Sequence, residues 1–217
     1  MNTTTTNTNT AAPWALLDYN GVLGHQPLPA DWQDLATAAH WTGTLTSFQD
    51  AFWKARDAYD RGTVTTAEFW ATLKTPPHAV ATATALDTAM WLRTDPHVLG
   101  LLADAVSRGV RLAMLSNAPT NVARAIEAAP WSGLFEHLLF SCDIGANKPE
   151  HPAYHHALTT LDTLHQPADV TFVDDRHDNV DAATRLGLRG HHYQGEPHTI
   201  HRAIHRVHPT RHRGDRR

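Results

Sequence analysis

The chain has 217 residues, of which 41% are hydrophobic, with seven tryptophans and a formal net charge of -4. The hydrophobic content excludes a disordered protein, and the acidic balance argues against nucleic acid as a partner. A single cysteine excludes an intrachain disulfide, and no apolar run approaches the roughly 20 residues that span a membrane. The N-terminus also lacks the apolar core of a signal peptide. We therefore expect a cytoplasmic monomer or homodimer that binds neither nucleic acid nor membrane.

The two ends of the chain differ in composition from its body. Residues 1–12 are polar and repetitive, which predicts a disordered tail, and residues 209–217 form a short basic tail. Between these tails, apolar runs that end in polar residues predict the strands of a parallel sheet. These runs span residues 14–17, 110–115, 137–140, 170–173 and 190–193. Because helical patterns follow the strongest runs, we expect an α/β fold: a Rossmann-like parallel sheet core flanked by helices, built from residues 13–25 and 91–208.

Residues 26–90, between the first two strands, have a different character. They contain no convincing strand, and their aromatic residues recur at spacings that suit amphipathic helices. Thr65 followed by Glu68 fits a helix start, and Pro76-Pro77 interrupts the helical pattern. We therefore expect a small all-helical insertion after the first strand. Its aromatic side chains are better explained as the core of a helical bundle than as a cage for a substrate.

The first chemical motif is Asp18-Tyr19-Asn20-Gly21, directly after the first predicted strand. The apolar run before it places the Asp18 carboxylate at the carboxyl end of a buried strand, where α/β folds carry their chemistry. Gly21 lets the backbone turn away without a steric penalty. The second motif, Ser116-Asn117, ends the second apolar run. Its hydroxyl and backbone N–H groups can bind a phosphoryl oxygen without adding charge, although a turn or helix cap explains the pair alone.

Two further motifs lie in the second half of the chain. Lys148 precedes Pro149 in a Gly-containing turn and is one of only three lysines, against fifteen arginines. A compact ammonium there can offset a nucleophilic carboxylate and a transferring phosphoryl group, although a solvated loop lysine is the simpler alternative. Asp174-Asp175 follow the fourth predicted strand, and adjacent carboxylates in this place repel each other unless a cation joins them. Mg²⁺, which prefers oxygen ligands, is the natural candidate.

The order strand-Asp, strand-Ser-Asn, Lys-Pro and strand-Asp-Asp resembles the haloacid dehalogenase (HAD) superfamily over essentially all of residues 14–195. The insertion resembles the small helical cap of that family, which implies a HAD-like fold with a cap at residues 26–90. The run from Tyr59 to Thr65, with Phe69-Trp70, is similar to cap segments of sugar-phosphate phosphatases and of the epoxide hydrolase N-terminal phosphatase domain. The resemblance implies a phosphatase whose substrate is a small phosphorylated metabolite.

The same resemblance implies roles for the motif residues. Asp18 is implied as the nucleophile that forms an aspartyl-phosphate, with Ser116 and Asn117 holding phosphoryl oxygens and Lys148 offsetting negative charge. The implied ligands of Mg²⁺ are the Asp18 carboxylate, the backbone carbonyl of Asn20 and Asp175, with Asp174 in or beside that set. Asn179 falls where relatives place a residue that orients the metal's waters.

Asn20 departs from the family pattern, in which a second Asp protonates the leaving group and then activates water. An amide cannot exchange a proton near neutral pH, and general acid–base catalysis is typically worth about 10²–10⁴-fold. Three outcomes stay open: a phosphatase in which His25 supplies the proton, a protein that binds a phosphorylated ligand without turnover, and a dehalogenase-like hydrolase acting at carbon. The Asp174-Asp175 pair argues against the last. Further candidate contacts with the substrate are His25, Arg56, Trp53, Tyr59 and Trp70.

Overall fold

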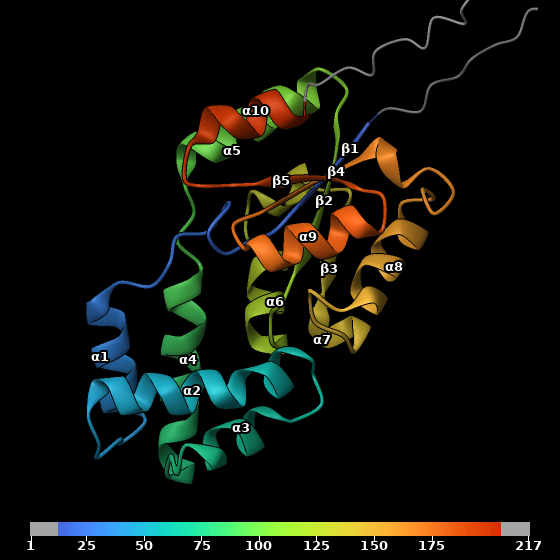
Figure 1. Ribbon diagram of the computed structural model, residues 1–217. Coiled ribbons are helices and arrows are strands. Elements are labelled where there is room, and N and C mark those ends of the chain that lie inside the picture. The colour runs from blue at the N-terminus through green and yellow to red at the C-terminus, as the bar shows by residue number, and fades with distance from the viewer. Residues whose placement is uncertain (1–12, 205–217) are drawn as a thin grey trace, which may run out of the picture.

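The computed structural model describes residues 13–204, which form a five-stranded parallel sheet with helices on both faces (Figure 1). The strand order is β3-β2-β1-β4-β5, and each neighbouring pair is parallel. The strands are β1 (Trp14–Leu17), β2 (Arg111–Ser116), β3 (His137–Phe140), β4 (Val170–Asp174) and β5 (Arg189–His192). The sequence-based bounds for β2, β4 and β5 differ from these by one residue. The expected tails, residues 1–12 and 209–217, lie outside the described residues.

Strand β1 is the centre of the sheet, between β2 and β4. All four of its residues are buried, which explains its continuous apolar run, because both faces of a parallel sheet are covered. Successive side chains point to opposite faces. Ala15 and Leu17 join one hydrophobic cluster, and Trp14 and Leu16 join the other.

The helices of the sheet region divide between these two clusters. On the face of Leu17, the hydrophobic cluster includes apolar residues of α5 (Pro96–Ser107), α6 (Thr120–Glu127) and α10 (Pro197–Ile204). On the face of Leu16 lie α8 (His151–Thr160) and α9 (His177–Arg185). The short helix α7 (Ser141–Ile144) follows β3 directly, and single 3₁₀ turns span Ser132–Leu134 and Pro167–Asp169. This arrangement confirms the predicted α/β fold of a parallel sheet flanked by helices.

Residues 26–90, which we call the helical insertion, contain helices and no strand in the structure. The helices are α1 (Pro29–Ala38), α2 (Leu45–Asp60), α3 (Thr66–Thr72) and α4 (Val80–Trp91), with a 3₁₀ turn at Pro77–Ala79. They form a separate group at the bottom of Figure 1, away from α5 and α10. Thr65 and Glu68 make a reciprocal capping box at the start of α3.

Aromatic rings fill the interior of the helical insertion. Phe52 of α2 is fully buried and contacts the rings of Trp32 and Phe69 edge to face, with centroids 5.1 and 5.4 Å away. Trp70 and Trp91 are also buried, whereas Trp53 is 50% exposed. Packing therefore accounts for most of these aromatic residues. Within residues 13–204, no helix combines the length and apolar character needed to cross a membrane.

Candidate active site

The chemical motifs meet at the carboxyl edge of the sheet. Asp18 follows β1, Ser116 is the last residue of β2, and Asp174 is the last residue of β4. Because β1 lies between β2 and β4, these three residues come from adjacent strand ends. Lys148 comes from the connection between α7 and α8 and extends to the same edge. This edge is where open α/β sheets bind their ligands.

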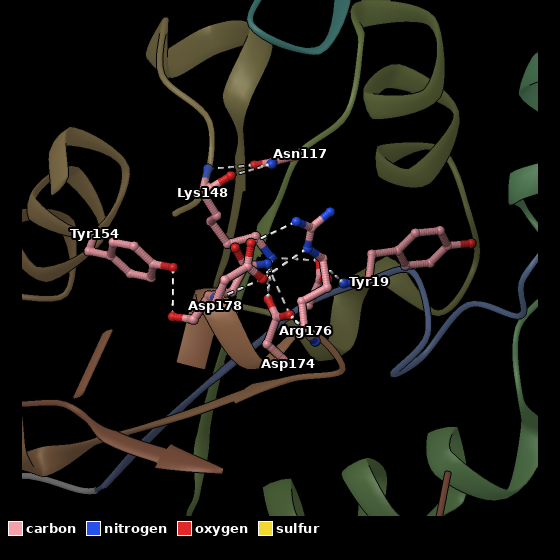
Figure 2. A network of polar contacts seen from close by, with 9 residues as sticks. Tyr19, Asn117, Lys148, Tyr154, Asp174, Arg176 and Asp178 are labelled. Carbon is pink, nitrogen blue, oxygen red and sulfur yellow. Dashed lines mark hydrogen bonds and ion pairs between the residues drawn. The ribbon is translucent and has the colours of Figure 1, made fainter. Parts of the chain in front are cut away.

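Lys148 joins two carboxylates at the centre of this site (Figure 2). Its Nζ lies 2.7 Å from Asp18 Oδ1 and 2.8 Å from Asp174 Oδ2, and the lysine side chain is only 1% exposed. Burial opposes the charged ammonium, but the two carboxylates outweigh it and raise the pKa of Lys148. Burial also raises the pKa of Asp18, to about 7, although Lys148 acts in the opposite direction.

The oxygens of Asp174 are already engaged by protein donors. Besides Lys148, its carboxylate accepts two 3.0 Å hydrogen bonds from Asn179 Nδ2 and one of 2.8 Å from the backbone N–H of Arg176. Asn179 is therefore fixed directly on Asp174. In turn the backbone carbonyl of Asn179 accepts a 2.9 Å hydrogen bond from the Tyr154 hydroxyl (Figure 2). Asp174 thus has a mainly supporting position beneath the more accessible carboxylates.

Asp175 is half-buried, and its carboxylate lies against the turn that follows Asp18. Burial, followed by the charge of Asp174, raises the pKa of Asp175. Gly21 has a φ of +79°, and a Cβ atom there would occupy the position of the Asp175 carboxylate. Only glycine adopts this positive φ without strain and also leaves room for the carboxylate. The Gly21 turn therefore brings the backbone of the first motif into contact with the Asp174-Asp175 loop.

A divalent cation fits this donor set. One carboxylate oxygen from each of Asp18, Asp174 and Asp175 can be chosen so that all lie within 4.8 Å of one another. Lys148 offsets only one of these three charges, so the cluster keeps an excess of negative charge. Hard divalent ions prefer such oxygen ligands. Because protein donors occupy Asp174, Asp18 and Asp175 are the better candidates to hold Mg²⁺.

The side chain of Asn117 is bound to the backbone of Lys148. Its Nδ2 donates to the backbone carbonyl of Lys148 at 2.8 Å, and its Oδ1 accepts from the backbone N–H of Lys148 at 2.8 Å (Figure 2). The side chain is therefore not available to a phosphoryl group unless this pair of bonds breaks. Ser116 remains at the edge, 1% exposed and next to the end of β1.

Asn20 and Tyr19 both carry a buried polar atom without a hydrogen-bond partner among the described residues. For Asn20 this atom is Oδ1, so the amide is not bound to a neighbouring side chain. For Tyr19 it is the hydroxyl, whose pKa burial raises above its usual value. The Tyr19 ring stacks on Trp131 at 5.7 Å and points away from the carboxylates in Figure 2. Tyr19 therefore belongs to the core, whereas Asn20 borders the site.

Arg56 is engaged away from the carboxylates, and among the described residues no hydrogen bond or ion pair joins the His25 ring to them. The His25 side chain is exposed, and the residue is fixed by a 2.8 Å hydrogen bond from its backbone N–H to the Arg93 carbonyl. Arg56 is 4% exposed, and its guanidinium forms ion pairs with Asp60 at 2.6 Å and Asp87 at 2.8 Å. The expected substrate contact of Arg56 is thus replaced by a buried ion-pair cluster inside the helical insertion.

Sequence reasoning missed one polar residue next to the site. Asn147 is 3% exposed, and its Nδ2 donates to the backbone carbonyl and to the Oδ1 of Asp57 in α2, at 2.9 and 2.8 Å. An amide in a loop gives no signal of such a role. Its position directly before Lys148 was the available clue.

Comparisons with known proteins agree with this geometry. A family model described as haloacid dehalogenase-like hydrolase matches residues 41–187. The sesquiterpene phosphatase astK of Aspergillus oryzae is 32% identical over 101 residues, which are 46% of this chain and 50% of that protein. The chain thus aligns with about half the length of this curated relative.

Solved structures share the fold. A HAD family enzyme of Bacteroides thetaiotaomicron, bt-2542, superposes with a TM-score of 0.72 and 17% identity, over 86% of this chain and 96% of that one. The same enzyme in complex with magnesium and inorganic phosphate gives a TM-score of 0.70 with 18% identity, over 85% and 96% of the two chains. The L-2-haloacid dehalogenase RSc1362 has a TM-score of 0.62 and 21% identity, over 82% and 85%. The chain belongs to the haloacid dehalogenase-like hydrolases.

Proposed function

We propose that this hydrolase is a Mg²⁺-dependent phosphatase acting on a small phosphorylated metabolite, with Asp18 as the nucleophile. The observation that carries the proposal is the group formed by the buried Asp18 and Asp174 and the half-buried Asp175 around Lys148 at the carboxyl edge of the sheet. Three carboxylates with one ammonium fit a divalent cation and the phosphoryl group that accompanies it. The resemblance to a sesquiterpene phosphatase supports a phosphate ester as the substrate.

Asp18 is arranged to act as a carboxylate nucleophile. Its Oδ1 lies 2.7 Å from Lys148 Nζ and also accepts the backbone N–H of Tyr19 at 2.6 Å. Both contacts engage Oδ1, so Oδ2 would be the attacking oxygen. In the proposed first step Oδ2 attacks phosphorus, an O–P bond forms, and the bond to the leaving oxygen breaks, with that oxygen taking its proton from solvent because Asn20 cannot donate one. Water then attacks phosphorus and gives its proton to solvent, which breaks the O–P bond to Asp18, releases phosphate and restores the Asp18 carboxylate.

The neighbouring residues bind and orient in this proposal. The Ser116 hydroxyl and the backbone N–H of Asn117 would hold phosphoryl oxygens, and Lys148 would offset charge. Asp18, Asp175 and the Asn20 carbonyl would hold Mg²⁺, which supplies Lewis-acid stabilisation of the transferring group when bound. The helical insertion would act as a cap that covers the site.

Asn20 supports a second candidate function, in which the protein binds a phosphorylated ligand with little turnover. The amide cannot donate a proton to a poor leaving group, and no hydrogen bond or ion pair among the described residues positions the exposed His25 side chain to do so. Under this alternative the metal and phosphate still bind, because the proposed ligand at Asn20 is a backbone oxygen. The two candidates differ only in the rate of hydrolysis.

Hydrolysis of p-nitrophenyl phosphate, with and without Mg²⁺, tests the proposal. Its good leaving group needs little protonation, so we expect Mg²⁺-dependent turnover that Asp18→Asn abolishes. Activity that survives Asp18→Asn would refute the nucleophile assignment. Stabilisation against heat by phosphate and Mg²⁺ without turnover would favour the binding protein. Release of halide from a 2-haloacid without Mg²⁺ would point to the dehalogenase chemistry instead.

A further inference from the structure

The end of helix α2 in the helical insertion is attached to the segment that carries Lys148. The Ser141 hydroxyl donates to the backbone carbonyl of Asp60 at 2.5 Å. The Arg61 guanidinium donates to both carboxylate oxygens of Glu150, at 2.6 and 2.5 Å. Residues 57–62 therefore lie along residues 141–150, and we call this contact the α2 junction.

Asn147 is the buried member of the α2 junction. Its neighbours in α2, the backbone carbonyl and the carboxylate of Asp57, only accept hydrogen bonds, so the Nδ2 group must face them. This orientation leaves Asn147 Oδ1 buried without a hydrogen-bond partner among residues 13–204. An unsatisfied buried oxygen carries a free-energy cost. If this position only filled space, leucine, which has nearly the same shape as asparagine, would fill it without an unsatisfied oxygen.

The backbone of Lys148 is consequently held from two sides. On the sheet side, Asn117 binds both its N–H and its carbonyl at 2.8 Å. On the side of the helical insertion, Asn147, the residue before it, is tied to Asp57. From this backbone position the side chain reaches Asp18 and Asp174.

We propose that Asn147 is a positioning residue, which uses helix α2 of the insertion to place the Lys148 ammonium between Asp18 and Asp174. The site is thereby coupled to the helical insertion through the lysine. The kinetic part of this proposal rests on the proposed phosphatase function, whereas the placement of the lysine does not. The alternative is that Asn147 only strengthens the contact at the α2 junction, as the ion pair of Arg61 with Glu150 does at its exposed edge.

Asn147→Leu separates these two explanations, because it keeps the volume of the side chain and removes its donors. The chain has only three lysines, and Lys54 and Lys74 are exposed, so NMR of ¹⁵N-labelled lysine ammonium groups resolves Lys148 as the one buried, slowly exchanging signal. We expect hydrogen exchange of that signal to accelerate at least about tenfold in Asn147→Leu, because the buried ion pair opens more often. Glu150→Ala, the control, removes the exposed contact with Arg61 without touching Asp57 and should leave the exchange rate unchanged.

The kinetic measurement uses the same variants. A displacement of a catalytic group by a fraction of an ångström is expected to lower kcat by about 10–100-fold with little change in KM. Asn147→Ser, which retains one donor, should recover part of the loss and replaces the leucine variant if that one does not fold.

Unchanged exchange in the Asn147 variants would overturn the proposal. An equal acceleration in Glu150→Ala would also overturn it, because any weakening of the α2 junction would then have the same effect. If the wild-type chain shows no phosphatase activity, the proposed function fails while the exchange measurement still decides the role of Asn147.

Discussion

Removal of the Lys148 ammonium is the sharpest test of how the site is held together. In Lys148→Met, Asp18 and Asp174 lose the cation that lies 2.7 and 2.8 Å from them, in a place where their side chains are 9% and 0% exposed. Removing one partner of a buried ion pair typically costs about 3–5 kcal/mol, because the remaining charge stays desolvated. Here two carboxylates remain, so we expect the upper part of that range at pH 8.

The pH dependence of this loss has a definite sign. Burial already raises the pKa of Asp18 from 3.8 to about 7. A carboxyl group whose pKa is higher in the folded state stabilises the fold at low pH, and that contribution disappears as the pH rises through the folded-state pKa. Without Lys148 the carboxyl pKa rises further. The difference in unfolding free energy between wild type and Lys148→Met should therefore be largest at pH 8 and shrink toward pH 5.

Urea denaturation at pH 8 and pH 5 measures this difference, with Lys54→Met as the control because Lys54 is exposed. For a chain of this length, a loss of about 3–5 kcal/mol corresponds to a fall in Tm of about 6–20 °C. Added Mg²⁺ should restore part of the stability at pH 8, since a cation then returns to the carboxylates. Equal stability of Lys148→Met and Lys54→Met at pH 8 would refute the reasoning.

Three other variants test separate features. Asn20→Asp should raise kcat for esters with poor leaving groups by about 10²-fold, and an unchanged rate would show that proton transfer at this position is not limiting. Gly21→Ala should weaken Mg²⁺ binding, measured by calorimetry, because the new Cβ displaces the Asp175 carboxylate. The control is Gly109→Ala, where φ is +86° but a Cβ would meet open space, so it should cost only about 1 kcal/mol of backbone strain. Burial raises the pKa of Asp60 to about 7, although Arg56 acts in the opposite direction. As the pH rises from 4 to 8, wild type should therefore lose stability relative to Asp60→Asn, by at most about 4 kcal/mol. A stability difference that shifts in favour of wild type over this range would contradict that sign.

The strands and their order of motifs were predictable because a buried parallel strand leaves a continuous apolar run. The bounds of β2 illustrate the limit, since Ser116 proved to be the last residue of the strand rather than the first after it. Hydrogen bonding to β3 extends β2 by that residue, through the pair of Ser116 with Phe140. A pairing between strands that are more than 20 residues apart leaves no local trace in either sequence.

The partners of polar side chains were the least predictable part of the site. Arg56 was a candidate substrate contact, and Asp60, one helical turn further along, is the counter-ion that the sequence could have indicated. Its second carboxylate, Asp87, lies 31 residues further along the chain. The Asn117 side-chain amide likewise binds the backbone N–H and carbonyl of Lys148, 31 residues away, so only its backbone remains as the expected phosphoryl contact. Residue type predicted that these side chains would be bound, whereas only the packing of helices and loops determined to what.

Asn20 alters the electrostatics of the site as well as its proton chemistry. An Asp at this position would add a further carboxylate near the three that Lys148 and Arg176 offset. An additional negative charge near this cluster raises neighbouring pKa values and repels an anionic phosphoryl group. The amide thus gives up a proton carrier and reduces the repulsion that a phosphorylated ligand must overcome. It follows that Asn20→Asp should raise KM along with kcat. The amide at position 20 is therefore compatible both with a binding role and with a slow phosphatase.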